Sequence, residues 1–251
     1  LQWNAAGWQV AGKGIKLING VYANEKLNNK LPNTYFDGSH MVFSAINATL
    51  ENFSFLKDTL SAQINLQTNE RGGLQVKKLK AYFKFTPDIM EFSNLDLQTN
   101  KSRLGNYYAM HFNSFGKDMG NFIEKVTLEL HLKSSEVNSD DIAVFAPALK
   151  NWKKIFQISG DAKGTIQDFK AKNLLVSTGN SSFNGNLSMA GLPDLNSTFI
   201  DLKATELQTN HNDLSLIIPG IKNSKVAFHK LGKIKYTGTF TGFPKDFVAY
   251  G

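Results

Sequence analysis

Apolar and polar residues alternate one by one along most of this chain, and this period of two constrains its fold more than any other feature. Alternation of this kind places apolar side chains on one face of a β-strand and polar side chains on the other. The clearest runs are Thr59–Gln67, Val126–Lys133, Phe156–Gln167 and Ile234–Gly242. Each run is polar on one side, which is typical of antiparallel sheets. We therefore predict an all-β protein with a long, curled and mainly antiparallel sheet.

Local interruptions of the alternation indicate where the sheet bends. Gly164, Gly185 and Gly238 fall in the apolar phase of their strands, where glycine fits either tight curvature or the close approach of a ligand. Lys77–Lys78 breaks the phase of its strand, which predicts a β-bulge.

Helical patterns are almost missing. One short helix is expected near 140–149, because Ser139 can cap free amides and Asp140 and Asp141 suit the positive end of a helix. Pro147 should end or kink it. A second turn is indicated around 116–122. We expect residues 1–251 to form one continuous segment, with a loose subdivision allowed near 134–154.

Two short sequence patterns recur. Leu-Gln-Thr-Asn occurs three times, at 66–69, 97–100 and 207–210, each at the end of a predicted strand. Phe183–Pro193 also echoes Tyr236–Pro244, since each segment begins with aromatic-x-Gly and ends with Gly-x-Pro. This repetition predicts a repeated hairpin unit.

Composition excludes several classes of protein. The chain has 251 residues and no cysteine, which excludes a disulfide framework, a thiolate zinc site and a catalytic cysteine. No run approaches the roughly 20 apolar residues of a transmembrane helix. The net charge of +7 comes from scattered lysines. These lysines are interpreted as residues of a solvated face, or as residues that attract anionic headgroups. No nucleic-acid partner is expected.

Residues that could carry catalysis are not grouped. The five histidines are separated in sequence and none has metal-ligand spacing: His40, His111, His131, His211 and His229. No nucleophile elbow, P-loop or dinucleotide fingerprint is present. We therefore predict that the chain is not an enzyme, with no catalytic residue, no metal site and no cofactor.

Several stretches together resemble one known family, the AsmA-like/TamB family (translocation and assembly module subunit TamB) in its Bacteroidota form. The resemblance covers about Val42–Phe247, and it depends on the order and number of degenerate motifs. They are Leu60–Leu66, Gly73–Phe83, Ile89–Thr99, Asp140–Leu149, Gly160–Ile166 and Gly185–Pro193.

The resemblance implies an internal segment of a longer protein that spans the periplasm of a Gram-negative bacterium. Parts outside the segment would anchor that protein in the inner membrane. Its sheet would fold like a taco into an apolar groove and support phospholipid transfer between membranes or outer-membrane assembly. Its implied partners are phospholipid and an outer-membrane barrel protein of the BamA/TamA type. We also expect a longer protein because the strand pattern of Phe247–Gly251 runs to the last residue.

The residues independently favour a role for the apolar face. A sheet with one apolar face and almost no helices must pack on itself, or curl and hold a ligand. Acyl chains suit the second case, at about 0.8 kcal/mol for each buried CH₂. The candidate groove-facing, lipid-binding residues are Leu60, Ile64, Leu66, Val126, Leu128, Leu130, Leu132, Phe156, Ile158, Phe183, Leu187, Met189, Ile200, Leu202, Ile234, Tyr236 and Phe240.

Two alternatives stay open at this point. A structural or adhesive β-protein with a sealed core would give the same alternation as a groove. A carbohydrate-binding or carbohydrate-cleaving protein would need exposed tryptophans and a carboxylate pair. Trp3, Trp8 and Trp152 are not clustered in the sequence.

Overall fold

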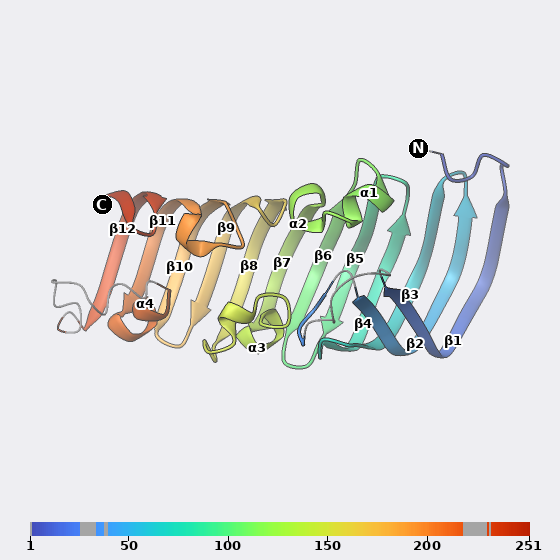
Figure 1. The fold of residues 1–251 in the computed structure, drawn as a ribbon, viewed down its shortest axis with the longest axis horizontal. Coiled ribbons are helices and arrows are strands. Elements are labelled where there is room, and N and C mark those ends of the chain that lie inside the picture. The colour runs from blue at the N-terminus through green and yellow to red at the C-terminus, as the bar shows by residue number, and fades with distance from the viewer. Residues whose placement is uncertain (1, 26–33, 38–39, 218–229, 231) are drawn as a thin grey trace.

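A single antiparallel sheet of 13 strands, in the order of the chain, forms the body of the computed structural model (Figure 1). The structure describes residues 2–25, 34–37, 40–217, 230 and 232–251. The strands are β1 (Gln9–Glu25), β2 (His40–Leu56), β3 (Thr59–Glu70), β4 (Gln75–Phe85), β5 (Ile89–Gln98), β6 (Arg103–His111), β7 (Thr127–Asn138), β8 (Ile155–Gly164), β9 (Asp168–Thr178), β10 (Ser181–Ala190), β11 (Phe199–Asn210), β12 (Lys233–Phe243) and β13 (Asp246–Tyr250). The sheet is open, with β1 and β13 at its edges. The predicted all-β, antiparallel class is confirmed.

Pairing preserves the alternation predicted from the sequence. On β7, Leu130 pairs with Tyr108 of β6 and with Ala162 of β8. Directly paired residues point to the same face of a sheet, so these three side chains share one face. The next residue, His131, pairs with Tyr107 and Asp161 on the opposite face. One face is therefore mainly apolar and the other polar.

Bulges interrupt the register of every strand pair from β1–β2 to β11–β12. A bulge inserts a residue, bends the strand and increases its twist. On β7, Leu132 and Ser135 pair with Gly160 and Ile158, so β7 has one extra residue there. Its alternation shifts by one position, and the same face continues across the bend. The predicted bulge at Lys77–Lys78 is confirmed by the register shift of β3 against β4.

The glycines of the apolar phase lie where neighbouring backbones approach closely. A Cβ atom on Gly185 would lie 2.0 Å from the carbonyl oxygen of Lys203, and one on Gly164 would lie 2.3 Å from that of Asp168. Gly238 has a φ of +152° and would meet the carbonyl oxygen of Tyr250 at 2.0 Å. Of the two interpretations of these glycines, close approach of backbone in a curved sheet accounts for all three.

Short helices line the two long edges of the sheet. Figure 1 shows α1 (Phe115–Met119) and α2 (Phe122–Lys125) at the upper edge, and α3 (Ser139–Ile142) and α4 (His211–Ile217) at the lower edge. Two 3₁₀ turns, η1 (Pro147–Leu149) and η2 (Leu195–Ser197), complete the described elements. No described helix has the length and apolar character needed to cross a membrane.

The helix expected near 140–149 is shorter than predicted and is capped by a different residue. Asn138 caps α3, because its side chain accepts a hydrogen bond from the Asp140 amide at 2.9 Å. Ser139, the predicted cap, is the first helical residue, and its hydroxyl accepts from the Lys154 amide instead. Pro147 begins η1 rather than ending a helix. Near 134–154, where the sequence allows a loose subdivision, residues 139–154 lie outside the strands, and β7 pairs directly with β8.

The repeated Leu-Gln-Thr-Asn copies occupy equivalent places. They lie at the ends of β3, β5 and β11, which run in the same direction and therefore end at the same edge. Each copy buries its threonine, Thr68, Thr99 and Thr209, with a hydrogen bond from or to the hydroxyl. The related segments of β10 and β12 lie on either side of β11 at the same level of the sheet. Phe183 of β10 and Tyr236 of β12 both pair with Leu207 of β11.

Candidate functional site on the apolar face

One ladder of directly paired residues crosses the whole sheet without a polar side chain. Each strand contributes one residue, and each residue pairs with the next across the neighbouring strand. In order from β1 to β13 the row is Val10, Phe55, Leu60, Phe85, Met90, Met110, Leu128, Gly164, Phe169, Met189, Ile200, Gly242 and Phe247. Because paired residues share a face, this row forms a continuous apolar band along the long axis of the molecule.

A second apolar row runs beside the first from β3 to β13. Its members are Ala62, Phe83, Phe92, Tyr108, Leu130, Ala162, Ala171, Leu187, Leu202, Phe240 and Ala249. Its aromatic rings pack on one another, with centroids 5.2 Å apart for Phe83 and Phe92 and 6.2 Å apart for Phe92 and Tyr108. Burial raises the pKa of the Tyr108 hydroxyl, which is therefore neutral at physiological pH.

The structure brings all the predicted groove-facing residues except Val126 onto this one face of the strands. Their placement follows from the paired rows and from the alternation along each strand. Val126 precedes β7 at the end of α2 and is 0% exposed. This complete burial leaves Val126 unavailable to a ligand.

The large aromatic side chains of β4, β5 and β6 were not among the predicted site residues. Phe83 and Phe85 continue the alternation of Leu79 and Ala81, and Phe92 continues that of Met90. This alternation alone predicts that these aromatic side chains lie on the apolar face. The places of these rings within the two rows, in contrast, depend on strand pairing.

Large apolar side chains on this face keep part of their surface exposed. Among the described residues, the buried apolar ones are Ala48, Ala62, Ala81, Leu95, Ala109, Phe112, Val126, Ala171 and Ala204. Most are alanines, so the larger side chains of the two rows lack a covering layer. The molecule exposes 15306 Å². A compact protein of its mass, 27.9 kDa, exposes about 11,000 Å².

The upper edge adds aromatic rings to one end of the apolar face. Phe115 of α1 contacts Phe85 with ring centroids 5.2 Å apart, and Trp3 contacts the same ring at 4.5 Å. The turn that carries Trp3 is fixed because the Asp58 carboxylate accepts from the backbone amides of Trp3 and Asn4, each at 2.7 Å.

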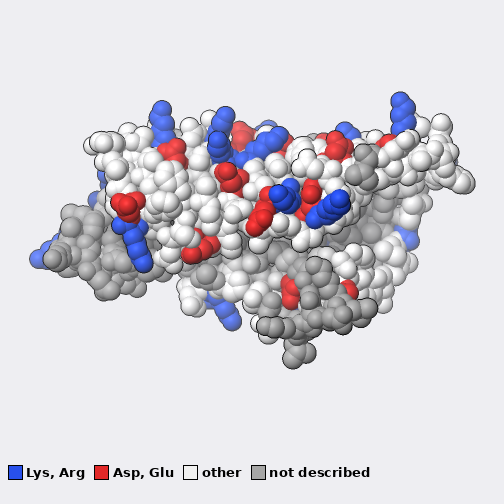
Figure 2. Space-filling model, turned by 45° about the horizontal axis from the view of Figure 1, so that its top comes forward, with Lys and Arg blue, Asp and Glu red and all other residues white. Residues whose placement is uncertain are grey.

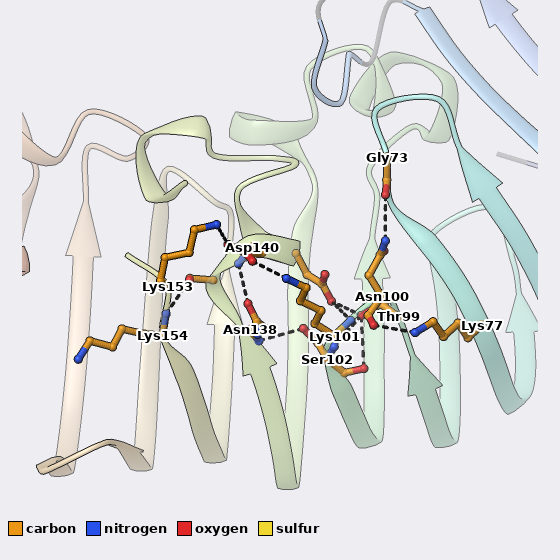
Figure 3. A network of polar contacts seen from close by, with 12 residues as sticks. Gly73, Lys77, Thr99, Asn100, Lys101, Ser102, Asn138, Asp140, Lys153 and Lys154 are labelled. Atoms are coloured by element: carbon orange, nitrogen blue, oxygen red, sulfur yellow. Dashed lines mark hydrogen bonds and ion pairs between the residues drawn. The ribbon is translucent and has the colours of Figure 1, made fainter. Parts of the chain in front are cut away.

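The lower edge is held by a polar network around α3. Asp141 is buried, and its carboxylate accepts from the Thr99 hydroxyl at 2.5 Å and from the Lys101 amide at 3.0 Å. Figure 3 shows Lys101 and Lys153 reaching Asp140, each at 2.7 Å. These contacts lower the pKa of Asp140 and tie the β5–β6 turn to the segment that follows β7. Asp140 and Asp141 thus serve the structure of the edge.

The polar face carries a cluster of charges centred on Glu129. Its carboxylate contacts Lys163 at 2.7 Å, His111 at 2.8 Å and His131 at 3.1 Å. The hydrogen bonds from Lys163, and then those from the two histidines, lower the pKa of Glu129 to about 2. Asp161 binds His131 at 2.7 Å and raises the pKa of that ring.

This cluster corrects one aspect of the sequence prediction for the histidines. His111 and His131 are separated in sequence, yet pairing of β6 with β7 places both on one carboxylate. Within the described residues, no group of three or more metal-ligating side chains has the arrangement of a metal site. Figure 2 shows positive and negative side chains interspersed over the surface it presents, which suits a solvated face.

No protein-family model matches this chain, and neither a curated protein nor a solved structure matches it. The resemblance to the AsmA-like/TamB family therefore stays a prediction. The same holds for the phospholipid, the barrel-protein partner and the periplasmic location that the resemblance implies.

Proposed function

We propose that the apolar face shelters lipid acyl chains in an open groove and supports the transfer of phospholipid between two membranes. The observation that carries this proposal is the unbroken apolar row from Val10 on β1 to Phe247 on β13, on a sheet without a second layer among the described residues. Partly exposed aromatic and aliphatic side chains of this kind gain free energy when hydrocarbon covers them.

The length of the row suits a conduit better than a single binding site. Thirteen strands spaced by about 4.8 Å extend roughly 58 Å along the sheet. One leaflet of a bilayer is about 15 Å of hydrocarbon, so the row is several acyl chains long. Contacts with methylene groups contribute about 0.8 kcal/mol each and are non-directional, so a chain can slide from strand to strand without breaking specific bonds.

The wider setting of this function is part of the same proposal and rests on the resemblance. Phospholipid would be the cargo, and the segment would belong to a periplasm-spanning protein anchored in the inner membrane by parts outside it. A BamA/TamA-type outer-membrane barrel protein would be the partner of that longer protein. Transfer along the face requires no catalytic residue and no cofactor.

A sealed structural core is the main rival, and it would need a second apolar layer over the face. The described residues provide only short helices and loops along the two edges. A carbohydrate site is less well supported, because Trp3 packs at the upper edge and Trp152 at the lower edge near η1. The partly exposed apolar rows therefore favour the open groove.

Site-specific photocrosslinking tests this proposal. A photoreactive side chain placed at Ile64, Ile158 or Leu202, on β3, β8 and β11, should capture lipid in cells. The matched positions Gln63, Gln157 and Lys203 are one residue away on the polar face and should capture little.

Each alternative gives a different pattern in the same experiment. A sealed core would give no lipid adduct from either set, and a carrier with one binding site would give adducts from one strand only. Equal capture from both sets, or no capture by a folded protein, would overturn the proposed groove.

A further inference from the structure

A small pocket opens on the apolar face next to α4, at the lower edge of the sheet. Its volume is about 140 Å³. Side chains from β8 to β11 form one side, while residues of α4 and of the turn after η1 form the other. The apolar walls are Trp152, Phe156, Val176, Phe183, Leu207 and Leu214. A larger hollow of about 440 Å³ lies over β8–β11 with a mainly polar lining, so it does not favour hydrocarbon.

Four of the polar residues that line this pocket, Lys154, Ser181, Thr209 and Asp213, are held in one hydrogen-bonded network. Asp213 accepts from Lys154 Nζ at 2.6 Å, from Ser181 Oγ at 2.5 Å and from Asn210 Nδ2 at 3.0 Å. The hydroxyls of Ser181 and Thr209 lie 3.1 Å apart. A polar ligand would have to displace these bonds, whereas hydrocarbon leaves them intact. The arrangement therefore selects an apolar ligand.

The size of the pocket limits how much of a ligand can enter. An apolar cavity of about 150 Å³ stays dry and accepts a molecule as small as benzene. A pocket of similar volume has room for the end of one hydrocarbon chain, and it excludes a headgroup or a pair of chains. The rest of the chain can continue along the apolar face, because Val176, Phe183 and Leu207 are paired residues of that face.

We propose that this pocket receives the methyl end of a single acyl chain and gives the lipid a fixed resting position over β8–β11. The inference rests on the proposed function and adds a site to it. On the rest of the face a chain slides among similar contacts, whereas here its end is enclosed on several sides. A bound lipid should therefore spend more time with its methyl end beside Trp152 than at other places along the face.

Fluorescence of Trp152 tests the site directly. Trp3→Phe and Trp8→Phe together leave Trp152 as the single tryptophan, and phenylalanine keeps a ring against Phe85 at position 3. The probes are straight-chain fatty acids that carry bromine, a contact quencher, either at the methyl end or beside the carboxylate. The methyl-end probe should quench Trp152 several-fold more than the carboxylate-end probe. Equal quenching, or stronger quenching by the carboxylate-end probe, would overturn the site.

Two further variants separate this site from the groove as a whole. Val176→Phe fills the pocket and Leu214→Ala removes one wall, so each should abolish the preference for the methyl-end probe. Leu175→Phe is the matched control, since Leu175 is 48% exposed on the polar face of the same strand and should leave the preference unchanged.

Lipid capture at Ile64 and Leu202, measured in the same variants, shows which proposal fails. If capture persists while Trp152 shows no preference in the unfilled pocket, the resting site is wrong and the groove stands. If capture is lost at every position of the folded parent protein, the proposed function itself fails. Should Val176→Phe not fold, Leu214→Ala alone decides, because a retained preference in that variant contradicts the site.

Discussion

Leu130 and His131 are neighbours on β7, yet Leu130 lies on the apolar face of the sheet and His131 on the polar face. The contrast between these two residues holds for the two faces as a whole. His131 contacts Asp161 and Glu129 within 3.1 Å, so the polar face satisfies its charges by itself. Leu130 lies between Tyr108 and Ala162 with part of its surface exposed and no second layer above it. The polar face is complete without a partner, whereas the apolar face gains free energy from one.

Long polar side chains also contribute to packing on the polar face. Ala109 is 0% exposed although its paired neighbours are Glu91 and Glu129. The aliphatic stems of long charged residues can cover small apolar surface while their ends stay in water. A one-layer sheet can thus bury apolar atoms on the face that carries its charges.

The sharpest test of the comparison replaces each of the two neighbours on β7. Leu130→Asp places a carboxylate between apolar side chains, and we expect it to lower the free energy of unfolding by several kcal/mol and to abolish lipid capture. His131→Ala removes two partly exposed ion pairs, with Glu129 and Asp161, and should cost about 1 kcal/mol or less. Urea denaturation measures both changes. Similar losses from the two variants would contradict the assignment of the faces.

A second test compares two glycines of the apolar face. Gly185→Ala forces a Cβ atom to within 2.0 Å of the Lys203 carbonyl oxygen, so the strands must move apart. We expect it to cost about 1–3 kcal/mol, as overpacking does in other cores. Gly12 has no atom within 4 Å of the corresponding position, and Gly12→Ala should change stability by at most about 0.5 kcal/mol. Equal denaturation midpoints for the two variants would contradict close strand approach at Gly185.

Alternation along the sequence predicted the strands and their apolar phase, because both depend on neighbouring residues alone. It did not predict which strand positions meet. Met90 pairs with Met110 because the turn between β5 and β6 has a particular length and because a bulge lies between Ser93 and Leu95. The continuous row is therefore a property of register, and register depends on turns and bulges that a two-residue period does not encode.

The errors of prediction have the same physical origin. Val126 is in phase with Leu128, but phase does not show that Val126 ends α2 and is fully buried. Asn138 and Ser139 are both good capping residues, and the length of β7 decides that Asn138 takes the role. Contacts between separate strands, such as those of His111 and His131 with Glu129, require the pairing of β6 with β7.

The smallest expected effect concerns the dependence of the polar face on pH. The pKa of Glu129 is lowered from 4.5 to about 2, so its stabilising contribution is complete above 4.5 and is lost as pH falls toward 2. The pKa of His131 is raised above 6.5, so its contribution is complete below 6.5 and is lost as pH rises through the folded-state value. The polar cluster should therefore stabilise most between pH 4.5 and 6.5.

Glu129→Gln tests this dependence against a matched control on the same face. The variant removes the group that titrates near pH 2, so its urea midpoint should fall less than that of the parent between pH 5 and pH 3. Glu51→Gln changes an exposed carboxylate of β2 and should leave the parent's slope unchanged. The difference should be small, because partly solvated ion pairs contribute about 1 kcal/mol or less. Parallel slopes for the parent and both variants would show that the Glu129 cluster adds nothing to acid stability, and the contrast between the faces would then rest on the apolar rows alone.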